Sequence, residues 1–136
     1  MNRTERSLWE RLNGCLPGVS DRVENAAGTG FPDVYGDCEK NSYWVELKVS
    51  PEKRALDKRR ALELLRPSQV VWLHRHVREG AVAFVAVGHP RGLVVYRVVY
   101  RDRRIELEKI ISLIGAFNTE NKLYFISEMR RSLQHV

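Results

Sequence analysis

The sequence predicts a single α/β domain over residues 1–136, because helical and strand patterns alternate along the chain. Leucines four residues apart predict a first helix over residues 4–16. Aromatic and β-branched residues at 43–49, uninterrupted by Gly or Pro, predict a strand. A second helix is expected to begin at Arg66-Pro67-Ser68-Gln69 and to end at Gly80. This order places helices against a central sheet.

The first helix is expected to have Thr4 as its N-cap and Glu5 in its first turn. At 100° per residue, Glu5 falls within the arc of Leu8 and Leu12, whereas Glu10 points nearly opposite them. A carboxylate on the packing face needs an explanation. The pattern leaves two open: an acid that serves a functional site, or a first-turn acid that complements the helix dipole.

A hairpin is expected upstream of the strand, because the run at 32–36 is followed by turn residues. Side chains alternate along a strand, so Trp44, Glu46 and Lys48 share one face. The other face carries the apolar row Tyr43, Val45, Leu47 and Val49. The hairpin therefore presents Asp33 beside Glu46.

Two carboxylates and an ammonium on adjacent strands are costly to bring together, because the like charges repel and half-buried ions lose hydration. A bound divalent cation offsets that cost in free energy. Asp33 and Glu46 supply hard oxygen ligands that suit magnesium or manganese, and the Leu47 carbonyl could add a further ligand. The ion would polarise a phosphate oxygen and lower the pKa of a bound water. Lys48 would orient that water or offset charge in the transition state.

These residues resemble the PD-(D/E)XK nuclease signature: Pro32-Asp33 and then Glu46-Leu47-Lys48, with twelve residues between Asp33 and Glu46. The wider order of segments is similar to small phage-type VRR-NUC nucleases and, more distantly, to archaeal Holliday-junction resolvases. The matching segments are 22–25, 30–36, 44–48, 66–69 and Gly80. The resemblance covers roughly residues 1–98 and implies a nuclease core, an α/β sandwich on a mixed central β-sheet flanked by helices.

The resemblance implies a metal-dependent endonuclease that hydrolyses DNA phosphodiester bonds. Asp33 and Glu46 would hold Mg²⁺ or Mn²⁺, and Lys48 would position the nucleophilic water. Gln69, in the first turn of the second helix, would hold the water or a phosphate. Branched or otherwise structured DNA, as for a Holliday junction resolvase, is the expected substrate and partner.

The same resemblance gives roles to residues near the N-terminus. Glu5 would be a third metal ligand, as a first-helix Glu is in related resolvases. Arg22 would contact phosphate, in a short edge strand expected at 22–24. Glu24 is an alternative acidic ligand. The alternative for both Arg22 and Glu24 is a solvated residue of a mobile loop, which is the simpler interpretation for Glu24.

A basic segment follows the strand, with too few apolar residues to be a core element. Its cations are Lys53, Arg54, Lys58, Arg59 and Arg60. Five cations in eight positions can neutralise several phosphates, and the net charge of +6 also favours a polyanionic partner. A solvated helix face is the alternative. A membrane surface would require an opposing apolar face, which the segment lacks.

Two continuous apolar runs, 81–87 and 93–99, predict strands buried on both faces. After a basic patch at 100–104, the apolar residues at 105–114 follow a helical pattern. We therefore expect a core of about 1–98 and an added C-terminal helical segment of about 104–136. Its apolar face would pack on the domain or on a second copy, which leaves a homodimer open.

No apolar run approaches the ~20 residues that span a bilayer, and the N-terminus does not resemble a signal peptide, so we expect a cytoplasmic protein. Cys15 and Cys38 are expected to be free thiols. His74 and His76 diverge on a helix, which argues against a paired metal site and favours surface or packing roles.

The leading alternative is a catalytically inactive nucleic-acid-binding protein that retains the nuclease fold. Every motif position carries a residue that is chemically competent for catalysis. This argues against the inactive binding protein, because an inactive site would usually have lost at least one of these residues. A third interpretation is a basic structural protein whose acidic pair is a surface feature of a hairpin.

Overall fold

The computed structural model describes residues 3–23, 30–52, 57–115 and 117–134. Within these ranges one six-stranded sheet has the same strand order in space as in sequence. Its strands are β1 (Val19–Arg22), β2 (Val34–Cys38), β3 (Asn41–Val49), β4 (Ala83–His89), β5 (Gly92–Arg101) and β6 (Arg104–Ile114). The helices are α1 (Arg3–Leu12), α2 (Lys58–Leu62), α3 (Pro67–Arg78) and α4 (Thr119–Gln134).

The sheet is mixed because β3 and β4 pair in parallel, whereas the other neighbouring strands pair antiparallel. A parallel pair needs a crossover connection, and α2 and α3 occupy the connection between β3 and β4. The expected α/β fold, a mixed central sheet flanked by helices, is confirmed.

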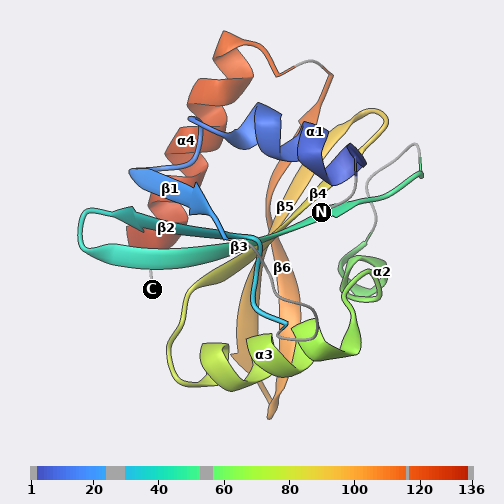
Figure 1. Ribbon diagram of the computed structural model, residues 1–136, viewed down its shortest axis with the longest axis vertical. Coiled ribbons are helices and arrows are strands. Elements are labelled where there is room, and N and C mark those ends of the chain that lie inside the picture. The colour runs from blue at the N-terminus through green and yellow to red at the C-terminus, as the bar shows by residue number, and fades with distance from the viewer. Residues whose placement is uncertain (1–2, 24–29, 53–56, 116, 135–136) are drawn as a thin grey trace.

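Helices cover both faces of the sheet, with α1 and α4 on one side and α2 and α3 on the other (Figure 1). The α1/α4 core contains Leu8 and Met129 together with Tyr43, Val45 and Leu47 of β3. The α2/α3 core contains Ala61, Leu65 and Leu73 with the opposite side of the sheet, and Trp44 packs against it. The predicted alternation of faces along β3 is confirmed.

The N-terminal boundaries differ slightly from the predictions. Helix α1 ends at Leu12, because Gly14 adopts φ +84° and the chain turns before Leu16. Thr4 lies inside α1, so it is not the N-cap. The edge strand β1 stands before the predicted position, and Glu24 lies outside the described residues.

Both apolar runs form strands as predicted, and β4 is buried along its whole length. Cys15 and Cys38 are buried free thiols, also as predicted. His74 packs its ring against Tyr100, with Nε2 3.2 Å from the Arg103 carbonyl oxygen. Among the described helices, none is long and apolar enough to cross a membrane.

The predicted helix over the apolar residues at 105–114 is wrong, because this segment is strand β6. It pairs with β5 along nearly its whole length and belongs to the sheet. The described residues of the predicted C-terminal extension, 104–115 and 117–134, therefore form a strand followed by one helix, α4. The core of the fold continues past residue 98 and includes β6.

A β-bulge explains why this strand resembles a helix in sequence. The β5–β6 register shifts at Ile110, which has no direct partner on β5. Before the bulge, Ile105 and Leu107 enter the α2/α3 core; after it, Ile111 and Leu113 enter the α1/α4 core. The extra residue, Ile110, packs beside Ile111 against the α1/α4 core. Apolar residues therefore stand at 107, 110, 111 and 114, which is the spacing of a helix.

Candidate active site

The β2–β3 hairpin brings Asp33 and Glu46 together. Val34 pairs with Val45, so Asp33, one residue before β2, comes opposite Glu46. The backbone N–H of Leu47 donates a hydrogen bond of 2.9 Å to Asp33 Oδ2. The N–H and C=O of a strand residue point to the same side, so the Leu47 carbonyl also faces the edge where Asp33 lies.

Glu46 is nearly inaccessible, with 2% of its surface exposed. Burial, followed by the charge of Asp33 and a hydrogen bond with its side chain, raises the pKa of Glu46 to about 9. The Lys48 ammonium lies 3.8 Å from Glu46 Oε1 and lowers that pKa, but its attraction does not cancel the larger effects. At neutral pH Glu46 therefore retains its proton unless a cation replaces it.

Gln69 links the start of α3 to the buried carboxyl. Its side chain is 2% exposed, and Nε2 donates to Glu46 Oε1 at 2.8 Å. Its Oε1 accepts from the backbone N–H of Arg66 at 2.8 Å, so both ends of the amide are occupied. Gln69 faces β3 as predicted, and in this structure it holds Glu46.

Gly30 allows the loop before Asp33 to lie directly on the start of α3. Its φ is +77°, and a Cβ atom there would stand 2.3 Å from the backbone oxygen of Ser68. No side chain fits at that distance, so glycine is required at this position. This close approach joins the loop that carries Asp33 to the helix that carries Gln69.

Glu5 lies half-buried in the first turn of α1, and its charge makes a smaller contribution to the raised pKa of Glu46. Within the described part of the chain, no three His, Cys, Asp or Glu side chains converge as a metal-binding group. The structure therefore brings Asp33 and Glu46 together and does not complete a three-ligand set with Glu5.

The predicted DNA-contacting cations lie on two sides of these carboxyls. Arg22 is exposed at the end of β1 and pairs with Val34, next to Asp33. Exposed cations Lys58, Arg59 and Arg60 lie on α2, on the side of the sheet that Glu46 and Lys48 share. Arg60 forms an ion pair with Glu52. Lys53 and Arg54 lie outside the described residues.

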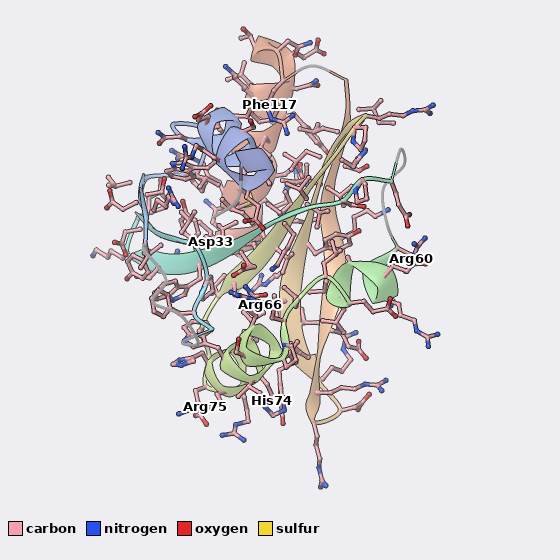
Figure 2. All side chains as sticks on the ribbon, turned by 45° about the vertical axis from the view of Figure 1, so that its right-hand side comes forward. Asp33, Arg60, Arg66, His74, Arg75 and Phe117 are labelled. Atoms are coloured by element: carbon pink, nitrogen blue, oxygen red, sulfur yellow. The ribbon has the colours of Figure 1, made fainter. Side chains whose placement is uncertain are left out.

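Sequence reasoning gave no role to Arg66. It is exposed and precedes α3, and its backbone N–H fixes Gln69. Figure 2 shows Asp33 between α1 and the start of α3, with Arg66 at that start. The signal available in the sequence was an arginine directly before a helix-initiating proline, with Gln69 two residues further on.

No protein-family model and no curated protein matches the chain. Among solved structures, the chain is similar to Hjc, a Holliday junction resolvase from the archaeal hyperthermophile Archaeoglobus fulgidus. Identity is 20% and the TM-score 0.46, over 79% of this chain and 85% of that one. A crystal structure of SSO0001 matches at 13% identity and a TM-score of 0.37, over 95% of this chain and 57% of that one. Likeness at these values is too weak to assign an activity.

Proposed function

We propose that the protein is a metal-dependent endonuclease that hydrolyses DNA phosphodiester bonds. One observation carries this proposal: the buried Glu46 touches Asp33 and Gln69, with the Lys48 ammonium 3.8 Å away. Burying Glu46 beside a second acid and an amine is unfavourable for stability, and a carboxyl with so strongly raised a pKa is typical of a functional site.

The donor set fits a divalent cation. Glu46 keeps its proton at neutral pH beside Asp33, and a cation relieves the same repulsion that the proton relieves. Mg²⁺ is commonly held by one or two carboxylates together with waters and substrate phosphate, so two carboxylates are enough. Glu5 and the Leu47 carbonyl are the further ligands we propose. When bound, the ion would polarise a phosphate oxygen and lower the pKa of a coordinated water.

Lys48 and Gln69 have different proposed roles. Lys48 projects from the same side of β3 as Glu46 and is partly exposed, so its ammonium can hydrogen-bond the attacking water or offset charge on the phosphate. Gln69 is a positioning residue: it holds Glu46 through Nε2 and is itself held by Arg66. These contacts restrict the carboxyl to one orientation before DNA arrives.

DNA would contact the exposed cations on both sides of the centre. Arg22 and the three cations of α2 are the described candidates, with Lys53 and Arg54 in the same basic segment. Contacts to phosphate carry no sequence information, so we propose selection by DNA structure, with branched DNA as the favoured substrate. A homodimer is also a proposal; Ile114, Leu123 and Tyr124 are exposed apolar residues available for it.

The test is cleavage of labelled branched, flapped, single-stranded and duplex DNA with Mg²⁺ or with EDTA. We expect Mg²⁺-dependent nicking that falls at least about a hundredfold in Asp33→Asn and in Lys48→Ala. Lys109→Ala, which removes an exposed cation of β6, is the matched control and should cleave at the wild-type rate. Wild-type nicking rates in both site variants would contradict the proposal. Tight binding by a wild-type protein that cuts nothing would favour the inactive binding protein.

A further inference from the structure

A row of aromatic rings leads away from the candidate centre on the side of the sheet that carries Glu46. Trp44 precedes Glu46 by two residues on β3 and therefore points to the same side. Its ring contacts Tyr35 of β2 and Trp72 of α3, with centroid distances of 4.8 and 5.2 Å. Trp72 then stacks on His76 at 4.0 Å, with 23° between the ring planes. We call Tyr35, Trp44, Trp72 and His76 the aromatic row.

Helix α3 fixes the distance between this row and the centre. Gln69, Trp72 and His76 are spaced i, i+3 and i+7, so they form one stripe along the helix. Gln69 bonds Glu46 directly. Seven residues at 1.5 Å each place His76 about 10 Å along the helix from Gln69.

Core packing explains only part of the row. Trp44 and Trp72 are partly buried against the α2/α3 core, and their rings meet edge to face, as buried aromatic rings commonly do. His76 is exposed, and its contact with Trp72 is a near-parallel stack. One face of the imidazole lies on Trp72, which leaves the opposite face for another flat ring.

The surroundings of His76 suit a nucleotide. Arg75 is exposed on the outer side of α3 (Figure 2), about 100° around the helix from His76, so it adds positive charge to this end of α3. Aromatic side chains beside basic residues are the usual elements of single-strand recognition, because every base has a π-face. In a paired duplex those faces are covered by neighbouring bases.

We propose that His76, backed by Trp72, stacks on one unpaired nucleobase of the DNA strand that is cut. This inference rests on the proposed nuclease function and specifies its substrate: DNA with an unpaired or splayed strand next to the cleaved bond. The distance of about 10 Å along α3 from Gln69 places the stacked base within a few nucleotides of the cut bond. The exposed imidazole thereby gives α3 a role in substrate selection as well as in holding Glu46.

The experiment measures the affinity of flapped DNA by fluorescence anisotropy without divalent metal, while a single abasic nucleotide is moved along the unpaired strand. For wild type we expect one position, within a few nucleotides of the cut bond, where loss of the base weakens binding about tenfold. For His76→Ala, intact DNA should already bind about tenfold more weakly, and the abasic nucleotide should have no further effect. His76→Tyr should restore both the affinity and the sensitivity to the missing base.

Val71→Ala, at an exposed apolar position of the same helix, is the matched control and should behave as wild type. The inference is overturned if no abasic position weakens wild-type binding, or if the weakening is unchanged in His76→Ala. Cleavage of the same DNA in Mg²⁺ is scored separately. If the protein cleaves this DNA but its affinity does not depend on His76, the stacking site is rejected and the nuclease proposal stands. If the affinity depends on His76 but the protein never cleaves, the stacking site is supported and the nuclease proposal is rejected.

Discussion

The two sides of β3 differ in what they bury. On one side, Tyr43, Val45 and Leu47 lie in the α1/α4 core among apolar neighbours. On the other, Glu46 is just as inaccessible, yet its neighbours are a second carboxyl, an amide and an ammonium. Apolar burial stabilises the fold, whereas an acidic pair without a cation destabilises it. One strand thus supplies stability on one side and the candidate chemistry on the other.

The largest effect on stability should come from the apolar side. Leu47→Ala removes a fully buried side chain and should lower the free energy of unfolding by about 2–5 kcal/mol. Lys48→Ala, one residue later and partly exposed, should lower it by less than about 1 kcal/mol. Urea unfolding of both variants measures the difference. Equal losses of unfolding free energy in the two variants would contradict the idea that one side of β3 supplies stability and the other side the candidate active site.

The connection between Asp33 and α3 can be broken at Gly30. Gly30→Ala places a Cβ against the Ser68 backbone, and should cost about 2 kcal/mol or more and slow DNA cleavage by displacing Asp33. Gly80→Ala is matched to it, because Gly80 also has positive φ but has nothing within 4 Å of the added Cβ. It should lose about 1 kcal/mol and keep its cleavage rate. Unfolding and cleavage assays separate the two.

The free energy of unfolding should depend on pH because Glu46 is buried beside a second carboxyl. The pKa of Glu46 is raised from 4.5 to about 9, so between these values the folded protein binds a proton that the unfolded chain does not. The free energy of unfolding should therefore fall as pH rises from about 5 to 9 in EDTA and level off above 9. Glu46→Gln should lack this decline and be more stable than wild type at pH 8, as measured by urea unfolding. Parallel pH profiles would contradict the raised pKa.

The smallest effect concerns the surface cations. Arg60 is exposed and pairs with the half-buried Glu52 at the surface, so Arg60→Ala should change stability by less than about 1 kcal/mol. If Arg60 contacts a phosphate, the slope of log affinity against log salt should become shallower by about one. Binding titrations at several salt concentrations measure this slope. An unchanged slope would remove Arg60 from the DNA interface.

The sequence predicted the parts of the molecule that depend on local patterns. Alternation along 43–49 identified the two sides of β3, and the turn after Gly36 predicted the hairpin that brings Asp33 to Glu46. Pro67 marked the start of α3. Periods of two and short turn signals act over a few residues, so they can be recognised without knowing the fold.

Features that depend on tertiary contacts could not be predicted in the same way. The bulge at Ile110 is visible only when β6 is paired with β5, so its apolar residues resembled a helix. The stack of Trp72 on His76 is visible only once the side chains are placed. In the sequence, the spacing of His74 and His76 indicated only that these two side chains diverge on a helix. The hydrogen bond from Gln69 to Glu46 requires the crossover that returns α3 to β3.

The central claim is that Asp33 and Glu46 bind a divalent cation in place of the proton on Glu46. Calorimetric titration of the protein with Mn²⁺ at pH 7, in buffers of different ionisation enthalpy, tests it most directly. We expect one bound ion and the release of about one proton in wild type, and loss of that binding in Asp33→Asn. Binding that is unchanged in Asp33→Asn, or that releases no proton, would contradict the claim.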